Sequence, residues 1–195
     1  MKRLIFLVVL SCGLALPSGA RAQSYDHGEV GVFADYLNLS RTDPHINFVG
    51  VGGRAALNVH PNVQLEAEMS YDFKRGYAST FSNGVTTQLV NTKLRPLSGL
   101  FGPKFLVGSG PLRAYATGKV GFVNFSVSDQ NAAAGFKGAL GAVNNGDTQF
   151  ALYPGAGVEG FWGPFGMRLE VGDEIYFDNG ARNNLKVTVG PVIRF

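Results

Sequence analysis

Cysteine is almost missing from this chain of 195 residues: the single one, Cys12, lies in an apolar stretch at the N-terminus. Beyond that stretch, the sequence can form no disulfide and has no thiolate for catalysis or metal binding. Long hydrophobic runs are missing there as well, since no later segment approaches the roughly 18 consecutive apolar residues of a membrane-spanning helix. The sequence therefore excludes a disulfide-stapled domain, and it predicts no transmembrane helix after the N-terminal stretch.

The N-terminal stretch itself has the pattern of a secretory leader. Lys2 and Arg3 form a basic region, residues 4–16 form an apolar core, and Ala20-Arg21-Ala22 forms a small-x-small cleavage site. We expect a signal peptide over residues 1–22, followed by a single domain over residues 23–195. Two alternatives stay open: an anchor that is never cut, and lipidation at Cys12, which ends a weak lipoprotein box.

An excess of positive charge is also missing once the leader is removed. The whole chain has 17 basic and 14 acidic residues, and the leader takes away Lys2, Arg3 and Arg21, which leaves 14 of each sign. A neutral domain without a basic stripe lacks the electrostatic basis for nucleic-acid binding. We therefore expect no nucleic-acid partner.

A strict alternation of apolar and polar residues is the main feature that is present. From Val63 to Phe73, apolar side chains at odd positions alternate with polar ones at even positions without an exception. A period of two is typical of a β-strand with one apolar and one polar face. The same pattern, in places weaker, predicts strands over residues 30–36, 49–59, 97–107, 112–122, 149–160, 165–171 and 185–195.

Strand length and loop pattern indicate a membrane barrel. Several of these strands run about 10–13 residues, whereas strands of globular sheets average about 5–6 and tilted transmembrane strands need about 9–11. The connections alternate between short turns and longer loops, as in barrels with short periplasmic turns. Tight turns are expected at residues 60–62, 108–111 and 162–164, a connection of moderate length at 40–45, and long loops at 74–91 and 126–147, while residues 178–183 lead into the last strand. We expect an all-β fold: an eight-stranded antiparallel transmembrane β-barrel, an up-and-down meander with both termini in the periplasm.

Charged residues gather on the faces that would point into this barrel. The bases there are Arg54, Lys104, Arg113, Lys119, Arg168, Lys186 and Arg194, and the acids are Glu29, Asp35, Glu66, Glu68, Asp72, Glu159, Glu170 and Glu174. Because an unpaired buried charge is costly, this near-balance predicts a paired network. Eight strands leave an interior barely wide enough for side chains. We expect a structural polar core, with Arg54, Arg113 and Arg168 most deeply paired; a gated pore is the alternative.

One stretch matches a cofactor motif by spacing alone. Residues 50–55 fit the dinucleotide pattern G-x-G-x-x-A, which requires a helix directly after it. The segment alternates like a strand, and Pro61 follows too soon for that helix. We therefore reject the motif and expect no cofactor.

The histidines give little support for a catalytic or metal site. They are His27, His45 and His60, and none has the spacing of a metal ligand relative to a partner. Only His45, which lies near Ser40 and Asp43, hints at the His and Ser chemistry of barrel enzymes that remodel lipids. We expect no catalytic residue and no metal.

The last predicted strand ends in a further pattern. Thr188, Gly190, Ile193 and Phe195 follow the order polar, glycine, apolar, terminal aromatic, which looks like the C-terminal signal read by the outer-membrane assembly machinery. With this motif and the strand pattern, the chain resembles the OmpA-like and OmpX-like small outer-membrane β-barrels over nearly its whole length after the leader. The resemblance implies a place in the bacterial outer membrane, contact with its lipids, and assembly by the barrel assembly machinery.

The resemblance leaves several functions open, because barrel folds carry many functions. Such barrels serve as envelope structure, surface-interaction proteins, narrow channels or, less often, enzymes. We expect a non-enzymatic structural or surface-interaction role through the outer loops, which leaves room for an extracellular ligand. The alternatives are a narrow channel for small solutes or ions, which bilayer conductance would reveal, and a lipid-modifying outer-membrane enzyme, which altered lipid acylation would reveal.

Overall fold

The computed structural model describes residues 27–39, 46–82, 87–108, 110–130, 148–178 and 180–195, and the predicted leader lies outside these ranges. Every regular element among them is a β-strand. The strands are β1 (Gly28–Leu39), β2 (Ile46–His60), β3 (Val63–Asp72), β4 (Arg75–Ser82), β5 (Thr87–Val107), β6 (Leu112–Gln130), β7 (Thr148–Trp162), β8 (Phe165–Asp173), β9 (Ile175–Phe177), β10 (Ala181–Arg182) and β11 (Asn184–Arg194). No helix in the described part of the chain is long and apolar enough to cross a membrane.

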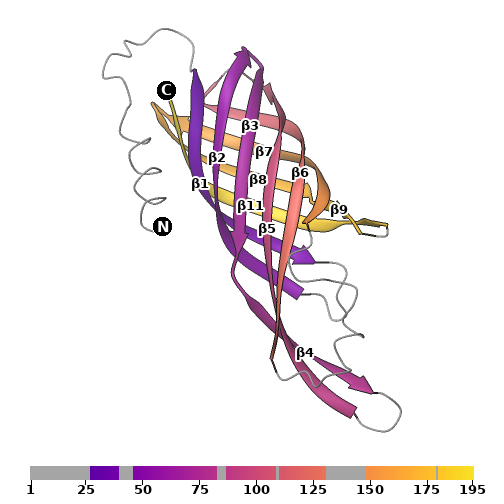
Figure 1. The fold of residues 1–195 in the computed structure, drawn as a ribbon. Helices are drawn as coiled ribbons and strands as arrows, with labels where there is room; N and C mark the ends of the chain where they lie inside the picture. The colour runs from indigo at the N-terminus through magenta and orange to yellow at the C-terminus, as the bar shows by residue number, and fades with distance from the viewer. Residues whose placement is uncertain (1–26, 40–45, 83–86, 109, 131–147, 179) are drawn as a thin grey trace, which may run out of the picture.

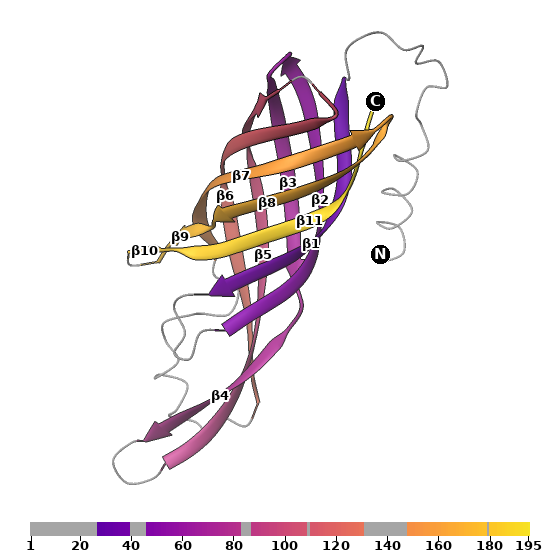
Figure 2. The same cartoon turned by 180° about the vertical axis from the view of Figure 1, so that it is seen from behind.

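These segments build the eight strands of a closed barrel (Figures 1 and 2). The short strand β9 continues β8, since both pair with β7. The short strand β10 pairs with β9 just as β11 pairs with β8, so β10 and β11 together form one barrel strand. β4 follows β3 along β5, after a break at Phe73 and Lys74. Neighbouring strands are antiparallel, β8 pairs with both β7 and β11, and the pairing of β1 with β11 closes the ring. The predicted fold class, an all-β eight-stranded up-and-down barrel, is confirmed.

The three predicted tight turns are also confirmed. Residues 61–62 join β2 to β3, residues 108–111 join β5 to β6, and residues 163–164 join β7 to β8. Gly108 and Gly163 have φ angles of 101° and 63°, a left-handed backbone that glycine adopts without steric penalty. The end of the barrel that carries these turns is called the inner end below, and the end that carries β4 is called the outer end.

The long loop predicted over residues 74–91 is wrong. β4 and the start of β5 pair there as a hairpin, from Arg75 with Leu94 to Ser82 with Thr87, and β6 runs beside them. These three strand segments form an outer extension that stands beyond the barrel (Figure 1). Outside a barrel wall neither face of a sheet has to be apolar, so the extension carries no period-two signal.

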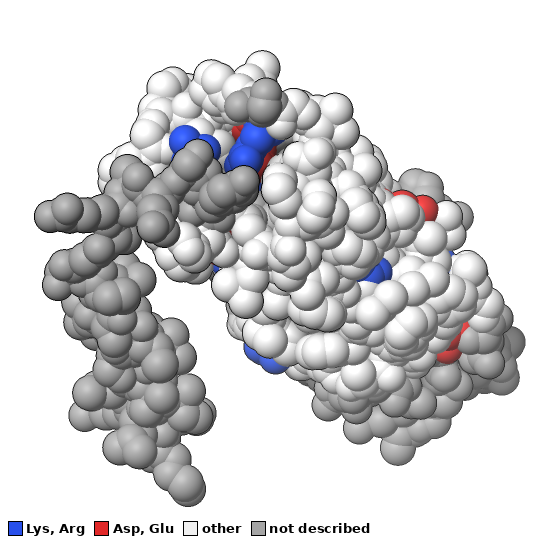
Figure 3. Space-filling model, turned by 90° about the horizontal axis from the view of Figure 1, so that it is seen from above, with Lys and Arg blue, Asp and Glu red and all other residues white. Residues whose placement is uncertain are grey.

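Burial along the strands follows the predicted faces. In β3, Glu66 and Glu68 are buried in the interior, whereas Leu65 and Met69 are 39% and 55% exposed on the outside. Figure 3, seen from the inner end, shows charged atoms gathered in the opening and a visible wall mostly free of them. An apolar outside around a charged inside is the arrangement of a barrel whose wall faces lipid.

Aromatic side chains mark both edges of this apolar wall. The exposed ones include Trp162, Phe165 and Phe195 at the inner end, and Tyr71, Phe73, Phe150 and Phe177 at the outer end. Phe150 and Phe177 stack with their ring centroids 6.0 Å apart. Two such belts flank the lipid-facing band of transmembrane barrels, because aromatic rings suit the membrane–water interface.

The seam between β1 and β11 closes the barrel through the chain ends. Gly28 and Phe195 exchange two backbone hydrogen bonds, each with an N···O distance of 3.0 Å. Further along the seam, a Cβ at Gly190 would collide with backbone atoms of Val32 and Phe33, so only glycine lets the two strands approach this closely. Of the predicted assembly motif, Thr188 is buried in the lumen, Gly190 lies at the seam, and Ile193 and Phe195 are exposed on the wall.

Candidate functional site

Ionisable side chains fill the lumen in three tiers along the barrel axis. The inner tier consists of Glu29, Lys104, Arg113 and Glu159; the middle tier of Arg54, Glu66, Glu68, Lys119, Arg168 and Glu170; and the outer tier of Asp35, Asp72, Glu174 and Lys186. Each side chain points inward because the opposite face of its strand belongs to the apolar wall. All of them except Arg113 are buried.

In the inner tier, two bases bridge two acids. Lys104 Nζ lies 3.0 Å from Glu29 Oε2 and 2.6 Å from Glu159 Oε2. Arg113 Nη2 lies 3.0 Å and 2.7 Å from the other oxygens of the same two carboxylates. Gln64 Nε2 donates a further hydrogen bond of 2.9 Å to Glu29. The charges of this tier cancel.

Lys119 is the centre of the middle tier. Its Nζ lies 2.7 Å from Glu66, 2.6 Å from Glu68 and 3.1 Å from Glu170. An ammonium group carries three N–H donors, so this lysine of β6 can bind two carboxylates of β3 and one of β8. The ring of Tyr153 lies below this ammonium, with its centroid 5.2 Å from Nζ.

Two arginines complete the middle tier. The Arg168 guanidinium binds the carboxylates of Glu66 and Glu170, and its Nε donates to Tyr115 Oη at 2.6 Å. Arg54 Nη1 lies 3.6 Å from Glu170 Oε2, and its Nη2 donates to Thr188 Oγ1 at 2.8 Å. The tier therefore holds three bases and three acids.

The same tier contains a group of carboxylates that resembles a metal site. Oxygen atoms of Glu66, Glu68 and Glu170 lie within 4.8 Å of one another, and no other such group of three metal-binding side chains occurs in the described part of the chain. Lys119 Nζ contacts all three carboxylates at 2.6–3.1 Å, which is the place that a cation would take. A buried ammonium thus neutralises this group in the way a metal ion would.

The outer tier is built around Lys186. Its Nζ donates to Glu174 Oε2 at 2.7 Å and to the hydroxyl oxygens of Ser70 and Ser98 at 3.0 Å each. Asp35 Oδ2 lies farther away, at 3.7 Å from the same nitrogen. This single lysine is the only base among the four residues of the tier.

An apolar cluster closes the lumen on the outer side of the outer tier. Its inward side chains include Leu37, Leu39, Phe48, Leu94, Phe125 and Tyr176, and each is exposed by 4% or less. The rings of Phe125 and Tyr176 meet edge to face, with centroids 5.0 Å apart. This outer plug was not predicted, although Leu37 and Leu39 continue the inward positions of Asp35 along β1, which is a readable signal.

The structure places fourteen of the fifteen predicted inward charges in the three tiers and the other, Arg194, at the inner rim. There Arg194 Nε donates to the Gly163 carbonyl at 2.9 Å, and its Cζ lies 4.5 Å from the Phe161 ring centroid. The expectation that Arg54, Arg113 and Arg168 are the most deeply paired bases is wrong for Arg54 and Arg113. Lysines sit deepest, because a compact ammonium fits among several carboxylates, while Arg113 lies near the opening.

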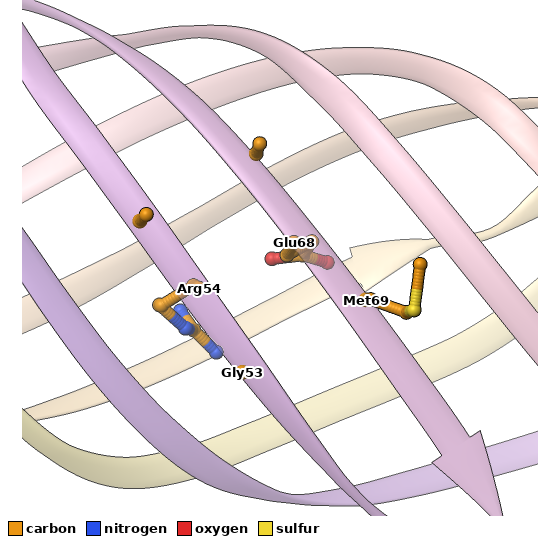
Figure 4. Close-up of a pocket in the computed structure, with 6 residues that line it drawn as sticks. Gly53, Arg54, Glu68 and Met69 are labelled. Atoms are coloured by element: carbon orange, nitrogen blue, oxygen red, sulfur yellow. The ribbon is translucent and has the colours of Figure 1, made fainter. Parts of the chain in front are cut away.

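The outer wall carries two shallow hollows. One, of about 310 Å³, lies between β2 and β3 and is lined by Gly53, Arg54, Ala55, Ala67, Glu68 and Met69, of which Arg54 and Glu68 belong to the lumen network (Figure 4). The other, of about 560 Å³, lies over β11, β1 and β2 and is lined mostly by apolar side chains. Neither gathers the convergent polar groups of a ligand site, and both open on the lipid-facing wall.

The dinucleotide-like stretch and two of the three histidines lie in the described part of the chain. Residues 50–55 form part of strand β2, as the rejection of the dinucleotide motif requires. His27 and His60 are exposed at the inner end, where the His27 carbonyl accepts a hydrogen bond of 3.0 Å from the backbone N–H of Asn58. His45, Ser40 and Asp43 lie outside the described residues.

Comparison with known proteins supports the fold. No protein-family model matches the chain, and no curated protein sequence matches it either. Solved structures that match include Neisserial surface protein A (TM-score 0.58, 13% identity, 87% of this chain and 97% of that one). Another is Ail, the attachment invasion locus protein of Yersinia pestis, in complex with the heparin analogue sucrose octasulfate (TM-score 0.53, 13% identity, 86% and 96%). The chain therefore has the fold of the small eight-stranded outer-membrane barrels that its sequence resembles.

Proposed function

We propose that this chain is an exported bacterial protein of the outer membrane, that its barrel is a closed structural support, and that it acts through the strands and loops at its outer end. The observation that carries the proposal is the outer extension, which stands beyond a lumen filled by paired charges and capped by the outer plug. A closed lumen opposes the channel alternative. A sheet beyond the wall supports interaction at the cell surface.

The lumen supports a structural role because the charges of its inner and middle tiers pair with one another. Lys104 and Lys119 are 0% and 1% exposed, and each binds carboxylates from at least two other strands. Buried pairs of this kind are lost only at high cost, so a transient water-filled path through them is unfavourable. The outer plug adds a second barrier, since apolar constrictions exclude water and ions.

The extension supports surface interaction because it is ordered by its own contacts. At its base, Arg75 Nε donates to the Asn47 carbonyl at 3.2 Å, and Arg95 lies over the Tyr71 ring at 5.0 Å. Among the described residues β4 pairs only with β5, so its other edge has no strand partner there. Such an edge, held away from the membrane, is a ready contact surface for another molecule.

Two measurements on one pair of proteins test this function. An epitope inserted between Ser82 and Thr87 should be labelled by antibody on intact cells, and the purified tagged protein should give no steady current in planar bilayers. In the matched control protein, an Asn-Gly turn across the Gly76–Lys93 pair replaces residues 77–92. The epitope is moved to the inner turn at residues 108–111. The control protein should insert into the membrane normally and should not be labelled on intact cells. Labelling that requires permeabilised cells, or a large continuous current, would overturn the proposal.

A further inference from the structure

Charge is balanced in two tiers of the lumen and unbalanced in the third. The inner tier has two bases and two acids, and the middle tier has three of each. In the outer tier, Asp35, Asp72 and Glu174 face a single base, Lys186. With every group ionised, this tier carries a surplus of two negative charges beneath the apolar plug.

Lys186 donates no hydrogen bond to either aspartate, because its three N–H groups bind other residues. The ammonium has three N–H donors, and they go to Glu174, Ser70 and Ser98 at 2.7–3.0 Å. Asp35 is left at 3.7 Å from this nitrogen, and Asp72 forms no ion pair with any described residue. The lysine therefore pairs closely with Glu174, lies at ion-pair distance from Asp35 without donating a hydrogen bond to it, and cannot balance the charge of both aspartates.

Asp35 and Asp72 share one row of the barrel wall. Asp35 pairs with Gly50 across β1 and β2, and Gly50 pairs with Asp72 across β2 and β3. Gly50 has no side chain to separate them, and Asp72 Oδ1 lies 2.8 Å from the point where its Cβ would be. The Asp72 carboxylate thus leans over the glycine, on the side from which Asp35 enters the lumen.

Their oxygens lack hydrogen-bond donors. Neither oxygen of Asp35 and not Oδ1 of Asp72 accepts a hydrogen bond from the residues that the structure describes, although the two side chains are only 2% and 1% exposed. A buried carboxylate without a donor or a counter-charge is strongly unfavourable. These atoms therefore point to a ligand that is positive and that binds oxygen.

We propose that Asp35 and Asp72 bind one small divalent cation, of the Mg²⁺ and Ca²⁺ class, over Gly50. A charge of two matches the surplus of the outer tier, and hard cations take carboxylate oxygens as ligands. Mg²⁺ in particular is often held by one or two carboxylates while it keeps several waters. The bound ion joins β1 to β3 across β2 beneath the outer plug.

Binding of Mn²⁺, a paramagnetic substitute for Mg²⁺, tests the site in the full-length protein purified in detergent and treated with chelator. Wild type should retain one Mn²⁺ per barrel in electron paramagnetic resonance titrations, and excess Mg²⁺ should displace it. Asp35→Asn and Asp72→Asn should each weaken binding about tenfold or more, since even outer-shell changes have effects of that size. The matched control is Asp173→Asn, an outer-end carboxylate that already accepts hydrogen bonds from Asn183 and Asn184, and it should bind like wild type.

Several outcomes would overturn the proposal. Wild type that binds no more Mn²⁺ than the Asp35→Asn and Asp72→Asn proteins has no site there, and the aspartates are then neutralised by protons. An equal loss in Asp173→Asn would place the binding on the surface. If the lumen variants fail to fold, as a heat-modifiability gel would show, wild type alone decides: its unfolding midpoint must rise when Mg²⁺ replaces chelator.

Discussion

Lys104 on β5 reaches Glu159 on β7, with its Nζ 2.6 Å from Glu159 Oε2. The two strands are not neighbours, because β6 lies between them in the barrel wall. The same ammonium also lies 3.0 Å from Glu29 on β1, so one side chain joins three strands across the lumen. Such contacts fix the cross-section of the barrel, which backbone pairing alone leaves free to deform.

Lys104→Met should therefore destabilise the barrel strongly. Removing one partner of a buried ion pair leaves uncompensated charge and typically costs about 3–5 kcal/mol. Urea titration in detergent, followed by the fluorescence of the single tryptophan, gives the free energy of unfolding. Arg194→Met is the control, because Arg194 lies at the inner rim and its loss should cost less than about 1 kcal/mol. If Lys104→Met and Arg194→Met lowered the free energy of unfolding equally, the ion pairs of the inner tier would not stabilise the barrel more than a contact at the rim does.

Charge on the outer wall should be tolerated only near its edges. Leu169 lies in the middle of β8 and is 45% exposed, whereas Leu112 begins β6 at the inner end and is 71% exposed. An arginine costs about 2–4 kcal/mol at the centre of the bilayer and about 0–1 kcal/mol near the interface. Leu169→Arg should thus lower the free energy of unfolding in lipid vesicles far more than Leu112→Arg. If both substitutions had the same effect, the assignment of this wall to lipid would be wrong.

The barrel could be predicted from sequence wherever each strand separates two environments. From Val63 to Asp72 one face meets the apolar outside and the other the charged lumen, and the resulting alternation shows both the strand and its orientation. β4 could not be predicted in this way, since a sheet beyond the wall has no reason to alternate. For the same reason β6 runs on to Gln130, past the predicted end of its strand.

The lumen was only partly predictable, for a different physical reason. Which residues point inward follows from period two, so the charges of the three tiers could be collected from the sequence. Which charge meets which depends on the stagger of eight strands, and Lys119 binds Glu66, Glu68 and Glu170 across distances that no local pattern encodes. The outer plug cannot be predicted from the charge pattern, because its inward positions hold apolar residues such as Phe48 and Leu94.

Two glycines of β6 should respond differently to a methyl group. A Cβ at Gly121 would collide with the carbonyl oxygen of Gly99 on β5, whereas a Cβ at Gly118 would meet nothing within 4 Å. Overpacking against backbone typically costs about 1–3 kcal/mol. Gly121→Ala should lower the unfolding midpoint in urea, and Gly118→Ala should leave it unchanged or raise it slightly. Tolerance of both substitutions would mean that β5 and β6 can move apart.

The C-terminal motif should act in assembly and not in stability alone. Phe195 is 46% exposed on the wall, and its backbone closes the seam to Gly28. Phe195→Ser should lower the amount of protein in the outer membrane and leave unfolded chains in the periplasm, as fractionation with a heat-modifiability gel would show. Phe165→Ser, at a similarly exposed aromatic of the same belt, should leave that amount near wild type. Equal amounts in the two variants would remove any special role from the terminal aromatic.

We expect the outer plug to be the barrier that prevents wild-type barrels from conducting ions in planar bilayers. Phe48 is fully buried on the outer side of the charged tiers, and Phe48→Ala would open space there and cost about 3–5 kcal/mol of stability. Water could then reach the outer tier, whose surplus of acids would favour cations, so brief cation-selective openings are expected where wild type shows none. Phe150→Ala removes a ring of the same size from the lipid-facing wall and should stay silent. If folded Phe48→Ala protein were as silent as wild type, the charged tiers alone would close the lumen, and the plug would serve only to stabilise the outer end.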